Sequence, residues 1–171
     1  MTTLHERMHR QARAYAGDAD RPLASYTGLM AVYATTVAGI SITARATARE
    51  LPDPKPWDVA LNALATHQLG RLIAKDPVTS PLRAPFTHFE GTTGPAELKE
   101  GARGTGARKA IGELLSCPFC TGLWIATGIT AGTVFAPRAT RLATTTLSAL
   151  AAADFLQFAR TALQRAAGET S

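Results

Sequence analysis

The sequence predicts an all-α protein, an integral membrane bundle of about four helices. Three observations support this prediction. No Asp, Glu, Lys or Arg occurs from Pro22 to Ala44 (23 residues) or from Leu114 to Pro137 (24 residues). Each stretch exceeds the roughly 20 apolar residues that cross about 30 Å of hydrocarbon. A third stretch, residues 142–159, contains Asp154 as its only charged residue. The alternative is a soluble helical protein with two fully buried helices.

The average composition conceals this clustering. A mean hydropathy of +0.00 with 18% charged residues is typical of a soluble protein. The net charge of +5 also suits nucleic-acid binding, but the basic residues flank the apolar stretches, without interleaved aromatic residues or a nucleic-acid motif. We therefore expect no nucleic-acid partner, and we assign the basic residues to lipid head groups and topology.

Residues 1–21 precede the first apolar stretch. Leu4, Met8, Ala12 and Tyr15 recur at helical spacing with arginines between them, as in an amphipathic helix on a membrane surface. A disordered tail is the alternative. Two further regions complete the predicted organisation: a helical membrane domain over 22–160 that contains a polar loop at 75–113, and a C-terminal tail over 161–171.

The first apolar stretch is rich in Ala, Thr and Gly. Its Ala34-x-x-x-Ala38 spacing lets a neighbouring helix approach closely. Thr35, Thr36 and Ser41 can hydrogen-bond to the backbone of their own helix, which makes them tolerable at lipid depth. The helix must end by residues 51–56, because three prolines there remove backbone donors and fix φ.

Residues 57–74 are apolar overall but contain Asp58, His67 and Arg71. At helical periodicity Asp58 lies on one polar stripe, while His67 and Arg71 lie on another that is nearly opposite. A helix with two polar stripes fits inside a bundle, with neighbours on several sides. If this segment does not cross the membrane, three spans remain.

An ion pair between Arg71 and Asp154 is a specific structural prediction. Ionisable groups at membrane depth are costly unless they are paired. The alternative is that Arg71 extends to the membrane surface beside Lys75. Both interpretations stay open at the level of the sequence.

The polar loop begins with a proline-rich segment, Asp76–Phe86. Three prolines and two hydroxyl residues predict a rigid turn that holds Arg83 near the membrane surface. There Arg83 would contact a lipid phosphate or a partner's carboxylate. Alternatively, the segment docks onto the bundle, which is the interpretation we favour.

The two cysteines of the chain stand in the sequence Cys117-Pro118-Phe119-Cys120, at the start of the second long apolar stretch. Pro118 favours the first turn of a helix and disfavours helical geometry at the residue before it. We therefore expect Cys117 to cap the helix, with Cys120 in its first turn on the same face. A thiol at a helix N-terminus is favoured as a thiolate.

Three interpretations of this cysteine pair follow. In a thiol–disulfide oxidoreductase, Cys117 would be the nucleophile and Cys120 the resolving thiol. In a zinc site, the two thiolates would be completed by His67 and His88 or by a second copy of the chain. In the third interpretation, which we favour, the cysteines are small packing residues on the face of Trp124.

Lys and Arg residues predict the sidedness. If all four apolar segments cross, the N-terminus, the polar loop and the C-terminus together hold twelve Lys and Arg residues, against five on the other side. Arg71, inside a span, is left out of this count. The positive-inside rule then places both termini and the polar loop in the cytoplasm of a cell membrane.

Two runs carry a resemblance to a known family: ATHQLGRLIAKDPVTSPLRAPFT at 65–87 and ELLSCPFCTGLW at 113–124. In this order they resemble a bacterial membrane family known as domain of unknown function 1360, over roughly residues 57–160. The resemblance implies a small integral membrane protein. It implies no activity.

The sequence therefore predicts a small multi-pass membrane component that is non-enzymatic and recruits or stabilises a partner through its polar loop. The expected partners are membrane lipids and either another protein or a second copy of the chain. No cofactor is expected. The alternative function is a thiol–disulfide oxidoreductase or a zinc-binding protein that uses Cys117 and Cys120, so the sequence leaves open whether the protein is an enzyme.

Overall fold

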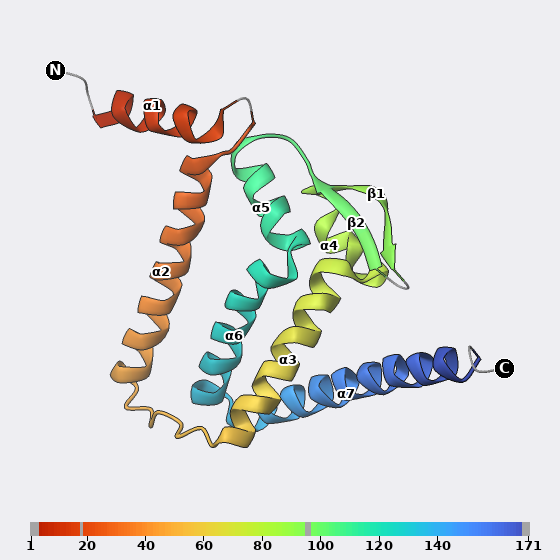
Figure 1. Cartoon of the computed structure of the whole chain (residues 1–171). Helices are drawn as coiled ribbons and strands as arrows, with labels where there is room; N and C mark the ends of the chain where they lie inside the picture. Colours follow the sequence, from red (N-terminus) through yellow and green to blue (C-terminus); the bar gives the residue numbers. More distant parts are fainter. Residues whose placement is uncertain (1–3, 18, 95–96, 169–171) are drawn as a thin grey trace.

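The computed structural model describes residues 4–17, 19–94 and 97–168. Within these ranges the chain is mostly helical, with one small two-stranded sheet (Figure 1). In chain order the elements are α1 (Leu4–Ala16), α2 (Leu23–Ala46), α3 (Pro56–Lys75), η1 (Pro77–Thr79), α4 (Ser80–Arg83), β1 (Thr87–Gly94), β2 (Glu97–Ala102), α5 (Gly106–Ser116), α6 (Pro118–Phe135) and α7 (Pro137–Gly168).

The segments before and after the main helices differ partly from the prediction. Residues 4–16 form a helix, and Tyr15 on it is exposed, whereas the side chains of Leu4 and Met8 lie outside the described set. At the other end, α7 continues without a break to Gly168, so most of the predicted C-terminal tail extends this helix.

Helices α2, α3 and α6 run alternately up and down the molecule (Figure 1). α2 leads away from the end that carries β1 and β2, and α3 returns to that end. At the start of α3, the Asp58 carboxylate accepts a hydrogen bond from the backbone N–H of Lys55 at 3.1 Å. Pro56 suits the first turn because it has no backbone N–H that would need an acceptor. α6 then descends beside α3. α2 and α6 therefore run in the same direction, and α3 runs opposite to both.

α3 is the central helix because it contacts both α6 and α7. Gly70 allows the close approach of α6: a methyl group placed there would lie 3.3 Å from the carbonyl oxygen of Pro118. On the other side, the Ser148 hydroxyl of α7 donates to the Leu61 carbonyl of α3 at 2.7 Å. The buried residues of α3 are small or polar rather than large and apolar, as in helix packing within membranes: Ala65, Gln68, Gly70 and Ala74.

α6 and α7 are joined by Ala136 alone and diverge from this junction (Figure 1). Gly132 faces Thr140 across the turn, and a methyl group on Gly132 would lie only 2.5 Å from the Thr140 hydroxyl oxygen. Gly128, one helical turn earlier, has open space in the same position. Of these two glycines, therefore, only Gly132 allows a close approach between α6 and α7.

The prediction of an all-α fold is wrong in the polar loop. β1 and β2 pair antiparallel, with Thr87 opposite Ala102 and Thr92 opposite Leu98, and register shifts interrupt the ladder. Helix α5 packs against β2, and Gly112 makes this possible, since any side chain there would meet the Phe86 carbonyl oxygen. We call residues 76–116 the cap: they form a folded unit at one end of the helices.

Among the residues that the structure describes, three helices, α2, α6 and α7, are long and apolar enough to cross a membrane by length and composition. In their most apolar 18-residue stretches only 6%, 6% and 17% of residues are buried within the molecule. α3 is not among them, although it has 20 residues and runs beside α6. Two of the three hydroxyls predicted to bond to the backbone of α2 do so: Thr36 donates to the Val32 carbonyl at 2.9 Å and Ser41 to the Val37 carbonyl at 2.8 Å.

Candidate functional site

The cysteine pair lies at the corner between α5 and α6. Cys117 is extended (φ −107°, ψ 108°) and its Sγ accepts the backbone N–H of Cys120 at 3.3 Å, so it caps α6 as predicted. The Cys120 thiol points at Cys117, with the two sulfurs 2.8 Å apart, and both cysteines are free. Cys120 is exposed and Cys117 is half-buried. The pair is thus accessible and arranged for either thiol to reach the other.

The structure does not gather the predicted zinc ligands. His67 lies on α3 and its ring stacks on Phe155 of α7, with ring centroids 6.4 Å apart. His88 lies on β1 beside Glu90, with 3.3 Å between its Nε2 and the carboxylate. Across residues 4–17, 19–94 and 97–168, no group of three or more His, Cys, Asp or Glu side chains could hold a metal ion.

Arg71 lies at a junction between α3, β2 and α7. Its Nη1 donates to Oδ2 of Asp154 at 2.9 Å, and its Nε donates to Oε1 of Glu97 at 2.8 Å. The amide of Gln68, which is buried, donates to the same oxygen of Asp154 at 3.0 Å. The structure thus brings Arg71 and Asp154 together and adds a second carboxylate from the cap. One guanidinium joins the cap to two helices.

Arg83 is fully buried in the cap, with an exposed fraction of 0%. All five of its N–H donor positions are used: Nε and Nη2 bind the Glu100 carboxylate at 2.6 and 3.1 Å, while the remaining donors reach the carbonyls of Ile73 and Asp76 and the hydroxyl of Thr79. Two of these acceptors are carbonyls at the C-terminal end of α3. Arg83 therefore holds the cap on the bundle. With every donor engaged inside the chain, Arg83 has none left for a lipid phosphate or a partner's carboxylate.

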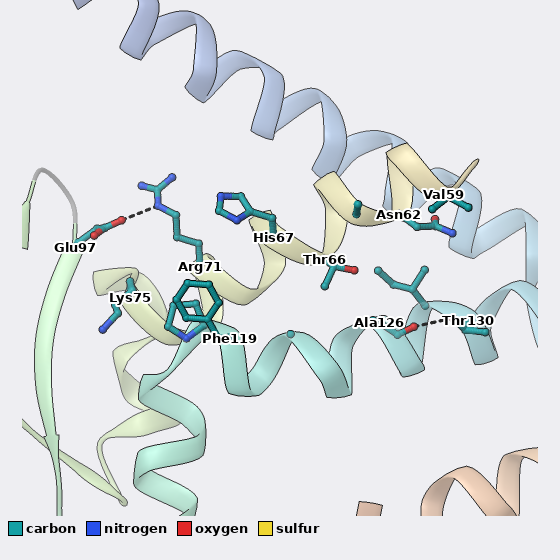
Figure 2. A pocket seen from close by; sticks show the side chains of 14 residues that line it. Val59, Asn62, Thr66, His67, Arg71, Lys75, Glu97, Phe119, Ala126 and Thr130 are labelled. Carbon is teal, nitrogen blue, oxygen red and sulfur yellow. Dashed lines mark hydrogen bonds and ion pairs between the residues drawn. The ribbon is translucent and has the colours of Figure 1, made fainter. Parts of the chain in front are cut away.

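A groove of about 640 Å³ runs between α3 and α6 (Figure 2). Its polar end lies at the cap, where Arg71, Lys75 and Glu97 line it together with Phe119. From there it follows both helices toward Val59, and its walls are mainly apolar, with the polar side chains of Asn62, Thr66, His67 and Thr130 among them. This size falls within the usual range of about 300–1,000 Å³ for ligand sites. The residues that line the rest of it are Asn62, Ala63, Thr66, His67, Pro118, Gly122, Ala126, Ile129 and Thr130.

Comparison with known proteins gives the family. Residues 61–160 match the model of a family described as "Protein of unknown function (DUF1360)". The chain belongs to this family. The matched range contains most of α3, the cap, α6 and most of α7, and so includes the groove apart from Val59, together with Arg71, Arg83 and the cysteine pair. The resemblance seen in the two sequence runs is thereby confirmed.

The chain is also similar to a curated protein, "Sporulation protein YjcA" of Bacillus subtilis (strain 168). The two are 43% identical over 72 residues, which cover 40% of this chain and 60% of the relative. The chain therefore matches less than two thirds of the relative's length. No solved structure matches the chain.

Three residues of the polar junctions were missed from the sequence. Gln68, Glu97 and Glu100 have no local pattern that marks them, because their partners are distant in the chain: Glu97 lies 26 residues from Arg71, and Glu100 lies 17 residues from Arg83. The available signal was that two acidic residues, Glu97 and Glu100, lie close together in the sequence after two arginines, Arg71 and Arg83. That signal is too common to identify pairs.

Proposed function

We propose that this member of the DUF1360 family is a multi-pass integral membrane protein in which α2, α3, α6 and α7 cross the bilayer. The observation that carries the proposal is the exposure of large apolar side chains around these helices. Monomeric soluble proteins rarely expose contiguous apolar patches larger than a few hundred Å². On α2, α6 and α7 the exposed large apolar residues include Met30, Val32, Ile42, Leu123, Leu142, Phe155, Leu156, Phe158 and Leu163.

The hydroxyl groups support the same proposal. Water is absent from the hydrocarbon core, so polar groups there must find partners within the protein. Several exposed hydroxyls on α2, α6 and α7 donate to the carbonyl four residues before them, as Thr127 does to Leu123 at 2.9 Å and Thr146 to Leu142 at 3.0 Å. They need no water to be satisfied.

α3 crosses as the fourth span in this proposal. It connects the far end of α2 with the cap, and its polar residues Gln68 and Arg71 meet Asp154 inside the bundle. Its mixed composition is tolerable because α6 and α7 cover two of its sides. Four spans place the termini and the cap on one side, which the distribution of Lys and Arg assigns to the cytoplasm.

The cap is the part that would bind a protein partner, and the protein would act as a non-enzymatic membrane component. The Arg83–Glu100 and Arg71–Glu97 pairs fix the cap as a rigid surface. Within the described ranges β1 pairs with β2 alone, so its outer edge is open, and Phe89 on it is exposed. An open edge can accept a strand of another protein. By its similarity to the Bacillus subtilis relative, we place this role in sporulation.

Two measurements test the membrane proposal. The full chain should stay in the membrane fraction after a carbonate wash and be released by detergent. Single cysteines in a Cys117→Ser, Cys120→Ser background then test the sidedness: Phe89→Cys on the cap should react with an impermeant maleimide only after cells are permeabilised, whereas Leu51→Cys between α2 and α3 should react in intact cells. Release by carbonate would contradict the proposal, and the reverse labelling pattern would contradict the orientation.

The placement in sporulation has its own test. A fluorescent fusion of the full chain in sporulating Bacillus subtilis should concentrate in the membranes of the developing spore. Uniform fluorescence over all cell membranes would contradict this placement while leaving the membrane proposal intact.

The second candidate function is thiol–disulfide exchange, favoured by the accessible sulfurs 2.8 Å apart. In it, the Cys117 thiolate attacks a partner's disulfide and releases one partner thiol. Cys120 then attacks the mixed disulfide, releasing the second thiol and leaving a Cys117–Cys120 disulfide. Cys120→Ser should trap the mixed disulfide with the partner on a non-reducing gel. If Cys117→Ser instead lowers the amount of folded protein and no mixed disulfide forms, the pair has a packing role.

A further inference from the structure

The polar end of the α3–α6 groove has no excess of positive charge. Arg71 and Lys75 are its two cations, and Glu97 lines it beside them. Asp154 contacts Arg71 from the α7 side, and Asp154 and Asp76 line the adjoining cavity next to the same two cations. An anionic ligand head would add to the negative charge at the edge of a low-dielectric region, which is costly, whereas a zwitterionic head adds no net charge.

The donors and acceptors at this end are not all used. Within the described ranges, Lys75 forms no ion pair, and it lines both the groove and a smaller cavity of about 230 Å³ next to Asp154. Arg71 uses Nε and Nη1, which leaves Nη2 available, and Glu97 uses Oε1, which leaves Oε2. In Figure 2, Arg71, Lys75 and Glu97 gather at the same end of the groove. That end can therefore receive both a negative and a positive group.

The rest of the groove suits a hydrocarbon chain. From Lys75 to Val59 the lining follows α3 for 16 residues, which corresponds to roughly 24 Å at about 1.5 Å per residue. One leaflet of a bilayer has about 15 Å of hydrocarbon, half of the full core. The groove is thus long enough for one acyl chain and its head group. Phe119, which is 92% exposed, stands at the boundary between the two parts.

We propose that this groove binds one glycerophospholipid with a primary-amine head group, of the phosphatidylethanolamine type. The phosphate binds Lys75 and Nη2 of Arg71, the ammonium binds Oε2 of Glu97, and one acyl chain lies along Ala63, Ala126 and Ile129. A zwitterionic head adds no net charge to the polar end and uses the free donors and acceptor together. The inference rests on the proposed membrane location.

Native mass spectrometry of the full-length protein in detergent tests the proposal, with phosphatidylethanolamine and phosphatidylglycerol of identical acyl chains as probes. The wild type should retain one phosphatidylethanolamine in preference to phosphatidylglycerol. Lys75→Gln should lower that retention by about tenfold, as expected for a lost charge-assisted hydrogen bond. Glu97→Gln should remove the preference for the amine head, and Ala126→Trp should block the groove and reduce both lipids.

Lys99→Gln is the matched control, because Lys99 pairs with Glu90 on the hairpin and does not line the groove. It should bind lipid like the wild type, and circular dichroism should show that each variant compared is folded. Equal retention by the wild type and Ala126→Trp would overturn the proposal, as would a preference for phosphatidylglycerol. The membrane fractionation above is a separate readout: a protein that stays in the membrane but shows no groove-dependent lipid leaves the membrane proposal standing and removes this one.

Discussion

Arg83 and Glu100 form a two-point ion pair inside the cap, with side chains 0% and 6% exposed. The pair joins the segment after α3 to β2, and the Thr87 hydroxyl adds a third contact to the Glu100 carboxylate at 3.1 Å. A buried pair of this kind is expensive to break, because removing one partner leaves the other charge without compensation. The cap therefore depends on it.

Glu100→Gln should destabilise the cap strongly. We expect the free energy of unfolding to fall by about 3 kcal/mol, the lower end of the range for breaking a buried ion pair. Glu90→Gln is the control: its partners Lys99 and His88 are on the surface, and the loss should stay within about 1 kcal/mol. Denaturant unfolding in detergent micelles measures both. Equal effects of the two substitutions would show that the Arg83 pair does not hold the cap.

The Arg71 junction should respond asymmetrically to substitution. Arg71→Ala leaves both Glu97 and Asp154 without a cation, whereas Asp154→Ala leaves Arg71 with Glu97. We therefore expect Arg71→Ala to lower the yield of folded protein more than Asp154→Ala. The double variant should be less harmful than the sum of the two, with a coupling of about 1–2 kcal/mol for residues in one network.

Size-exclusion chromatography of the detergent-extracted variants gives the folded yield, and denaturant unfolding gives the coupling. Strictly additive effects would show that Arg71 and Asp154 act independently despite their contact. A larger effect of Asp154→Ala than of Arg71→Ala would show that the hydrogen bond from Gln68 matters more than the ion pair.

Gly112 and Gly128 form a matched pair for a test of packing between α5 and the β1–β2 hairpin. Both lie within helices, but a methyl group on Gly112 would meet the backbone of Phe86, whereas Gly128 has open space. Gly112→Ala should cost about 1–3 kcal/mol through overpacking. Gly128→Ala should be neutral or stabilise by up to about 1 kcal/mol through helix propensity. Thermal unfolding of the two variants measures the difference in stability. A harmless Gly112→Ala would show that α5 does not pack closely on the β1–β2 hairpin.

Tyr33 and Trp124 make an aromatic contact between α2 and α6, edge to face with ring centroids 5.1 Å apart. The Tyr33 hydroxyl also lies 2.9 Å from the Thr127 hydroxyl. Trp124→Ala should therefore weaken the docking of α2 by about 1 kcal/mol or more, whereas Leu123→Ala, on an exposed position of the same helix, should have little effect. Protease sensitivity of the segment between α2 and α3 reports this docking. Equal sensitivity of both variants would argue against the contact.

The helices were largely predictable because their signals are local. The absence of charge over 22–44 and 114–137 predicted α2 and α6, and Pro118 predicted the helix start with Cys117 as its cap. The hairpin in the cap was missed because glycines at positions such as 91 and 101 are typical of loops. These strands are held by cross-strand and ion-pair contacts, which local sequence patterns do not contain.

The sequence by itself determined where the apolar helices lie, where the prolines break them, and which family the two sequence runs at 65–87 and 113–124 resemble. Only the tertiary structure decided that Arg83 is buried with every donor engaged, that Arg71 joins Glu97 and Asp154, and that α3 and α6 enclose a groove with a polar end. The physical reason is that hydrophobic patterning and backbone restriction act between near neighbours in the chain. Charge pairing and cavity shape depend on residues that meet only when distant segments have packed.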